Sequence, residues 1–210
     1  MAGDPLTVEK TILVLLAAGM SQRFGDTAKL HEDFLGRPLG LHVAVALEDM
    51  PFQERIAIVD ADPLPYDQHG YRVMTNADPK QGMASSLHLG VDCAKAQGAD
   101  AVLIALADMP RVTAAHVYRL FDASAGPDAV VASSDGDHPV PPVLFGRGRF
   151  DALLALQGSE GARALIRGGR HVVASTAELV DIDTPADLEK LRALIHSRAA
   201  IDRAQGRMTG

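Results

Sequence analysis

Two short runs, Thr11–Leu16 and Ala101–Leu106, constrain the fold most, because they are apolar on almost every consecutive position. A strand of this kind must be covered on both faces, whereas a half-exposed strand alternates apolar and polar residues. Coverage on both faces is typical of a parallel sheet held between two layers of helices. The runs therefore favour an α/β fold.

Amphipathic segments alternate with further short apolar runs along the chain. Helices are predicted over Pro38–Glu48, Ser85–Gln97, Thr113–Ala123, Phe150–Leu156, Gly161–Ile166 and Leu188–Ile195, and strands over Glu54–Val59, Tyr71–Met74, Ala129–Ala132 and His171–Ala174. This alternation predicts βαβ units in a three-layer sandwich with a mostly parallel sheet. We expect one domain over residues 1–210, with its core at about 11–196 and a tail, 197–210, that frays.

Capping residues mark several helix starts. Ser85 or Ser86 is expected to cap one helix, and Thr113 another. Before the last helix, Thr184-Pro185-Ala186-Asp187 combines a cap, a proline in the first turn and an acid three residues after the cap.

Composition narrows the range of partners. The net charge is −7, aromatic residues make up 4% and tryptophan is absent, which argues against binding to nucleic acid or to an anionic membrane. No apolar stretch reaches the ~18 residues of a transmembrane helix. The segment before the first apolar run is mixed in charge, unlike a signal peptide, so a cytoplasmic protein is expected. The single cysteine, Cys93, excludes an intrachain disulfide.

The loop after the first run has the features of an anion-binding turn. Small residues let the backbone approach a ligand, so that successive N–H groups can point at phosphate oxygens. A serine hydroxyl and two cations add further donors. The predicted nucleotide-binding residues here are Leu16, Ala17, Ala18, Gly19 and Ser21, and the predicted catalytic residues are Arg23 and Lys29. Neither a P-loop motif nor a dinucleotide-binding glycine motif is present.

Acidic residues follow the second run and precede the last helix. Asp108 lies two residues past Leu106, where a strand should end on the same edge of the sheet as the first loop. Asp181 and Asp183 alternate around Ile182 and should face one side. Since Mg²⁺ usually takes one or two protein carboxylates, Asp108 and Asp183 are the predicted metal ligands. Asp181 stays open as the second ligand in place of Asp183. It also stays open that Asp183 or Thr184 only caps the last helix.

Two other segments are candidates for substrate binding. The polar loop 76–86 precedes a helix and offers side-chain and backbone groups to a pyrimidine; its predicted nucleotide-binding residues are Asn76, Asp78, Gln81, Gly82 and Ser85. The segment 146–170 is a basic patch in an acidic chain, with five arginines. It could hold a phosphorylated second substrate or form a solvated helix face.

Five segments, taken in order, resemble the MobA-like nucleotidyltransferases, and most of all the molybdenum cofactor cytidylyltransferases. They are Leu16 to Gly25 with Lys29, Gln81 to Leu87, Ala107 to Pro110, Pro139 to Phe145 with Gly161 to Arg163, and Asp181 to Pro185. The resemblance spans roughly residues 11–195. It implies a fold of the nucleotide-diphospho-sugar transferase type.

The resemblance also implies an activity. Guanylyl-transferring members carry a second glycine where this chain has Ala18, and cytidylyl-transferring members carry alanine. The implied reaction is transfer of CMP from CTP to the phosphate of a molybdopterin cofactor, with Mg²⁺ as cofactor and release of pyrophosphate. The implied partners are CTP, the phosphorylated pterin and a molybdoenzyme or its chaperone, and a monomer is favoured.

Two alternatives stay open. One is a nucleotidyltransferase of the same fold that uses GTP or CTP and another phosphorylated acceptor, bound by residues 137–170. The other is a non-catalytic protein that binds or delivers the cofactor and releases no pyrophosphate. A redox enzyme is less favoured, because the dinucleotide motif is absent.

Overall fold

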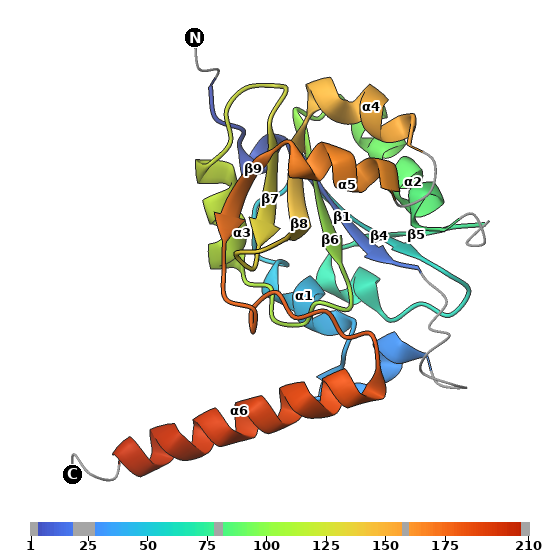
Figure 1. Cartoon of the computed structure of the whole chain (residues 1–210). Helices are drawn as coiled ribbons and strands as arrows, with labels where there is room; N and C mark the ends of the chain where they lie inside the picture. The colour runs from blue at the N-terminus through green and yellow to red at the C-terminus, as the bar shows by residue number, and fades with distance from the viewer. Residues whose placement is uncertain (1–3, 19–27, 78–81, 157–159, 207–210) are drawn as a thin grey trace.

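A computed structural model describes residues 4–18, 28–77, 82–156 and 160–206. Within these ranges, seven strands form one sheet in the order β5-β4-β1-β6-β8-β7-β9 (Figure 1). The strands are β1 Thr11–Ala17, β4 Glu54–Val59, β5 Arg72–Thr75, β6 Ala101–Leu106, β7 Val130–Ser134, β8 Pro139–Gly146 and β9 Arg170–Val173. Strand β8 is antiparallel to both its neighbours, and the other pairings are parallel.

The predicted α/β sandwich with a mostly parallel sheet is confirmed. Helices α1 Leu41–Ala46 and α3 Ala114–Asp122 cover one face, and α2 Met83–Ala96, α4 Phe150–Leu154 and α5 Glu160–Arg167 cover the other. In β1, Leu13 and Leu15 pack toward the first layer, whereas Ile12 and Val14 pack toward the second. This division explains why the strand is apolar on consecutive positions.

Strand β8 is absent from the sequence prediction. Three prolines, Pro139, Pro141 and Pro142, occupy its first half, and proline normally argues against an interior strand. The structure accommodates them at an irregularity in the pairing with β7, where Ala132 pairs with Val143 but Ser133 pairs with Val140. The ladder to β6 begins beyond the prolines, at Val143.

Helix starts agree with the sequence at Thr113 and Thr184 and differ at α2. The Thr113 Oγ1 caps α3 by accepting the N–H of His116, and Thr184 and Asp187 form the reciprocal cap of α6, Pro185–Gly206. The predicted cap at Ser85 or Ser86 is wrong. Helix α2 begins earlier, with Gly82 at the N-cap in a conformation of φ +80° that favours glycine.

Helix α6 is longer than the sequence predicts. It continues to Gly206, past residue 197, where we expected order to end, and it extends away from the sheet (Figure 1). Within the described part of the chain, no helix is both long and apolar enough to cross a bilayer.

A third apolar cluster lies outside the sheet. It consists of Phe34, Leu39, Ile182, Leu188 and Leu191. Phe34 lies in the small hairpin of β2 Asp33–Phe34 and β3 Arg37–Pro38, and the last two residues lie on α6. The cluster therefore joins the segment that follows Lys29 to the segment that contains Asp183.

Gly90 of α2 offers a test of the packing between helix and sheet. A Cβ atom added there would lie 2.4 Å from Cγ1 of the fully buried Val14. We expect Gly90→Ala to lower the free energy of unfolding by about 1–3 kcal/mol, because overpacking outweighs the higher helix propensity of alanine. Urea titration would measure the change, with Gly168→Ala as control, since a Cβ there makes only ordinary contacts. A Gly90→Ala variant as stable as the parent would contradict this packing.

Candidate active site

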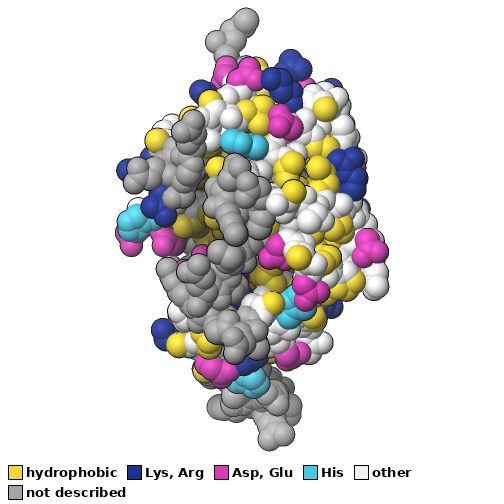
Figure 2. All heavy atoms as spheres, turned by 90° about the vertical axis from the view of Figure 1, so that its right-hand side faces the viewer, with side chains coloured by type: hydrophobic (Ala, Val, Ile, Leu, Met, Phe, Trp, Pro, Cys, Tyr) yellow, Lys and Arg dark blue, Asp and Glu magenta, His cyan; other side chains and the backbone are white. Residues whose placement is uncertain are grey.

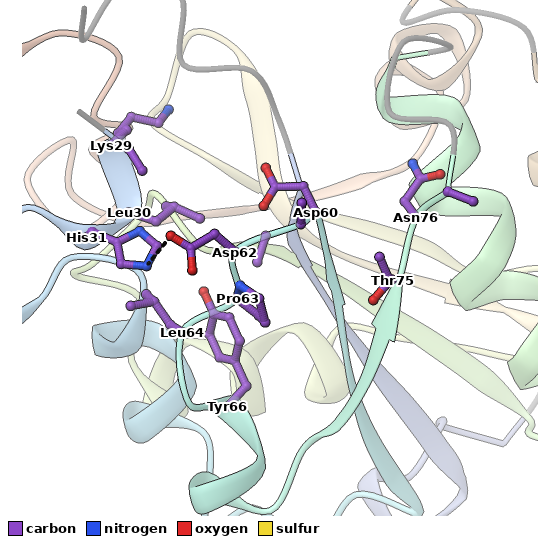
Figure 3. Close-up of a pocket in the computed structure, with 14 residues that line it drawn as sticks. Lys29, Leu30, His31, Asp60, Asp62, Pro63, Leu64, Tyr66, Thr75 and Asn76 are labelled. Atoms are coloured by element: carbon purple, nitrogen blue, oxygen red, sulfur yellow. Dashed lines mark ion pairs between the residues drawn. The ribbon is translucent and has the colours of Figure 1, made fainter. Parts of the chain in front are cut away.

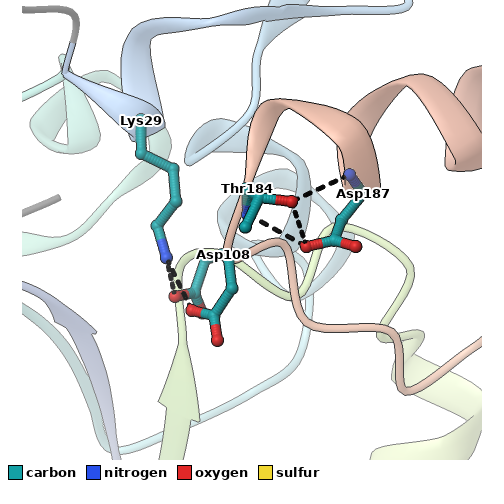
Figure 4. A network of polar contacts seen from close by, with 5 residues as sticks. Lys29, Asp108, Thr184 and Asp187 are labelled. Carbon is teal, nitrogen blue, oxygen red and sulfur yellow. Dashed lines mark hydrogen bonds and ion pairs between the residues drawn. The ribbon is translucent and has the colours of Figure 1, made fainter. Parts of the chain in front are cut away.

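Lys29 forms the centre of a charged cluster at the carboxyl end of β6. Its Nζ lies 2.6 Å from Oδ2 of Asp108 (Figure 4). The same atom lies 3.7 Å from Oδ1 of Asp183. The side chains of Lys29 and Asp108 are only 13% and 20% exposed, whereas that of Asp183 is 54% exposed. Three residues that the sequence singled out thus come together from segments far apart in the chain.

The backbone holds these segments in place. Asp108 follows β6, and the N–H of the preceding Ala107 donates to the Leu16 carbonyl at the end of β1 (3.1 Å). The Asp108 carbonyl in turn accepts the N–H of Ile182 (3.1 Å), which fixes the loop that contains Asp183. Lys29 opens the 3-10 helix Lys29–His31 on the opposite side of the cluster.

A third carboxylate, Asp181, belongs to the same cluster. Burial, followed by the negative charges of Asp108 and Asp183, raises the pKa of Asp181 to about 7, against the effect of Lys29. Part of its surface still faces solvent, so water screens this repulsion. One ammonium therefore faces three carboxyl groups, and the cluster is short of positive charge.

The cluster fits a divalent cation. Oδ1 of Asp108 is buried and has no hydrogen-bond partner among the described residues, and an unpartnered carboxylate oxygen is costly to bury. Among the same residues, no group of three or more His, Cys, Asp or Glu side chains is arranged to hold a metal ion alone. Magnesium needs fewer protein ligands than that, because it usually completes its shell with phosphate oxygens and water.

A pocket of about 580 Å³ opens beside the cluster, where β1, β4 and β5 end (Figure 3). Lys29 and His31 lie on one side, and Thr75 and Asn76 lie on the other, with Asp60 between them. Figure 2 faces the side toward which these strands point and shows acidic and basic side chains mixed with apolar ones. The pocket has the position expected for a ligand site in an open α/β sheet.

Besides Lys29, the pocket has four titratable side chains, and the sequence analysis missed all of them: Asp60, Asp62, His31 and Tyr66. Asp60 directly follows β4, as Asp108 follows β6, and that position was the available signal. His31 and Asp62 lie 3.8 Å apart (Figure 3). The Tyr66 hydroxyl is buried without a partner among the described residues, and burial followed by nearby negative charge raises its pKa, so it stays a donor.

Asn76, a predicted nucleotide-binding residue, lines the pocket at the end of β5. Its Nδ2 donates to the hydroxyl oxygens of Ser85 (2.8 Å) and Ser86 (2.9 Å), and the Ser85 hydroxyl donates to the Gly82 carbonyl (2.9 Å). Asn76 therefore ties the first turn of α2 to the end of β5.

The other predicted nucleotide-binding and catalytic residues differ in where they lie. Ala17 lines the pocket, and Ala18 follows it. The Leu16 side chain packs into the core, its carbonyl accepts the N–H of Ala107, and the residue does not line the pocket. Five predicted residues lie outside the described part of the chain: Gly19, Ser21, Arg23, Asp78 and Gln81.

Comparison with known proteins connects this geometry to a family. Residues 13–176 match the family model described as the MobA-like NTP transferase domain. The purine catabolism protein PucB of Bacillus subtilis is 31% identical over 196 residues, which cover 85% of this chain and 94% of PucB. A molybdenum cofactor guanylyltransferase of Cereibacter sphaeroides is 30% identical over 192 residues, which cover 89% of this chain and 97% of that protein.

A solved structure agrees with the fold. A nucleotidyl transferase from Methanothermobacter superposes with a TM-score of 0.73 at 22% identity, and the match covers 90% of this chain and 98% of that one. The expected nucleotidyltransferase type of fold is thereby confirmed.

Proposed function

The chain belongs to the MobA-like NTP transferase family and is an NTP-dependent nucleotidyltransferase, and from this premise we propose that it transfers CMP from CTP to the phosphate of a molybdopterin-type acceptor, releasing pyrophosphate. We propose further that residues 1–210 act as a single catalytic unit. The similarity to a molybdenum cofactor guanylyltransferase supports the acceptor. Ala18, in the position where guanylyl-transferring members carry glycine, supports CTP.

The observation that carries the proposal is the position of Lys29 between Asp108 and Asp183 at the edge of the 580 Å³ pocket. A nucleoside in the pocket, flanked by Ala17 and Asn76, would extend its phosphates toward this cluster. Arg23, in the loop after β1, is proposed to add a second cation there.

The reaction joins two anionic partners. An oxygen of the acceptor phosphate attacks the α-phosphorus, a new P–O–P bond forms, and the bond to the β-phosphate oxygen breaks, so that its electron pair leaves with pyrophosphate. The attacking phosphate is already ionised, and so no protein side chain has to remove a proton from it. The task of the protein is to position both partners and to offset their repulsion.

Lys29 is placed for that task. Its ammonium can turn from Asp108 to a phosphate oxygen, and it would then offset the charge that grows on the departing pyrophosphate. Asp108 and Asp183, or Asp181 in its place, would hold Mg²⁺. When bound, the ion supplies charge neutralisation and a fixed orientation of phosphate oxygens.

Use of GTP is the second candidate, because the relative from Cereibacter sphaeroides is named a guanylyltransferase. The acidic lining of the pocket also suits guanine, whose ring N–H and amino group both donate hydrogen bonds. Asp60 is the carboxylate placed to receive them, since it lies between the two walls (Figure 3).

A panel of nucleotides separates the two candidates. We expect CTP with Mg²⁺ to raise the melting temperature more than GTP, ATP or UTP, because a ligand stabilises the state that binds it. Pyrophosphate release with a molybdopterin extract should show the same preference. A clear preference for GTP would overturn the role given to Ala18, and binding without pyrophosphate would support a delivery protein instead.

A further inference from the structure

A second cavity, of about 330 Å³, lies between the β7–β8 turn and α5. It is lined by His138, Pro139, Arg163, Ile166 and Arg167. Arg163 and Arg167 are one helical turn apart on α5, and His138 precedes β8. Three basic side chains therefore surround a small hollow whose remaining walls are apolar.

Among the described side chains, the two arginines of this cavity have no counterion. Neither forms an ion pair with any residue that the structure describes, and Arg167 donates only to the Arg163 carbonyl. Like charges one turn apart destabilise a helix slightly. By contrast, Arg147 and Arg149 of the same basic segment contact Asp100 (3.1 Å) and the Asp128 carbonyl (2.9 Å).

The turn contains two acidic residues, Asp135 and Asp137, and the carboxylate of Asp135 is hydrogen-bonded within the turn. Asp135 accepts the N–H groups of Asp137 (3.0 Å) and His138 (2.8 Å). These two hydrogen bonds hold the pKa of Asp135 below its usual value. The Asp135 carboxylate thus stabilises the turn that presents His138.

One wall of the cavity, formed by His138 and Pro139, lies toward the reactive end of the sheet. Because β8 is antiparallel to β6, its first residue, Pro139, lies toward the end at which β6 gives way to Asp108. The 580 Å³ pocket lies on the other side of Asp108, over β1, β4 and β5. In the strand order of the sheet, β6 with Asp108 at its end therefore lies between the strands of the large pocket and β8, which starts at Pro139.

We propose that Arg163, Arg167 and His138 form a binding site for a phosphate group of the acceptor, a claim that rests on the proposed function. Two guanidinium forks can each make paired hydrogen bonds to a tetrahedral dianion, and their two charges match its charge. Pro139 and Ile166 suit the less polar part of the same molecule. The chain is acidic overall, so this local excess of positive charge selects a small anion, not a nucleic acid.

Two measurements test this site. The first is titration of the metal-free, nucleotide-free protein with inorganic phosphate and, separately, with pyrophosphate at low ionic strength, where screening is weak. We expect the double variant Arg163→Ala, Arg167→Ala to bind phosphate about tenfold more weakly or worse, because it loses charge-assisted hydrogen bonds. The second is acceptor-dependent pyrophosphate release, in which KM for the acceptor should rise at least ~10-fold while KM for CTP stays within about twofold.

The matched control is Arg149→Ala, Arg170→Ala, which removes the same charge from the same segment; Arg170 starts β9 at the other end of the sheet. If phosphate binding weakened equally in both double variants, the overall charge of the protein would explain the effect. That result would overturn the proposed site. An unchanged KM for the acceptor would overturn it as well. A further outcome is that pyrophosphate binds in competition with CTP and loses affinity in the Arg163→Ala, Arg167→Ala variant. That result would overturn the acceptor site and assign the cavity to the leaving group. If the parent enzyme releases no pyrophosphate, the proposed function fails, and the phosphate titration still decides the site.

Discussion

Lys29→Ala is expected to slow nucleotidyl transfer by about a hundredfold or more, the effect of losing one preorganised charge from a site where negative charge develops. The loss should appear in kcat, because the ammonium acts on the departing pyrophosphate and contributes less to ground-state binding. Initial rates of pyrophosphate release at saturating nucleotide would measure it. Lys29→Arg should recover part of the rate, since it keeps the charge but changes its shape.

Folding must be measured beside the rate. Lys29 is the 2.6 Å partner of the mostly buried Asp108, and removal of one member of such a pair leaves the other without compensation. Lys10→Ala is the control, because Lys10 pairs with Asp100 (3.7 Å) at the opposite end of the sheet and lies far from the pocket. A folded Lys29→Ala protein with normal turnover would remove Lys29 from the mechanism.

Asp108→Asn is expected to lower turnover by about 10² or more and to remove most of the response to Mg²⁺. The amide keeps the shape of the side chain but loses the charge that draws a cation to this end of β6. Pyrophosphate release over a range of Mg²⁺ concentrations would measure both effects. Asp100→Asn, in the remote pair, should leave the magnesium response unchanged.

The two substitutions combined separate structure from chemistry. Lys29→Met with Asp108→Asn removes both charges, so its stability should exceed that of Lys29→Ala, while its turnover stays as low as that of the worse single variant. Recovery of turnover in the double variant would mean that the pair serves only to stabilise the fold.

The regular part of the fold could be predicted because local and global signals agree there. The strands Glu54–Val59 and Ala101–Leu106 coincide with the predicted segments. Caps at Thr113 and Thr184 have a strong local signature and form as expected. The consecutive apolar residues of β1 predict a strand covered on both faces, and all seven of its residues are buried.

The remaining elements depend on contacts that sequence patterns do not encode. The prolines of β8 argue against a strand in the sequence, and its position depends on pairing with β6 and β7. The start of α2 depends on Gly82 and on Asn76, which contacts Ser85 and Ser86 from another strand. The local sequence therefore favours a cap at Ser85 or Ser86, whereas the N-cap of α2 is Gly82.

The site was predictable where position in the chain implies position in the fold. Asp108 and Lys29 follow that rule, and the structure brings them into contact. Tyr66 does not, because a buried tyrosine has the same sequence context whether its hydroxyl faces a pocket or the core. The roles of Arg23 and of Asp78 stay predictions, since both lie outside the described residues.

The small cluster of Phe34, Leu39, Ile182, Leu188 and Leu191 has a consequence for how activity and folding depend on the C-terminal helix. The seven-stranded sheet has its own two cores, whereas the spacing of Lys29 and Asp183 depends on this separate contact. Damage to the first turns of α6 would therefore leave a folded protein with a misaligned pair of charges. Selection could adjust catalytic precision through these few aliphatic side chains without disturbing the scaffold.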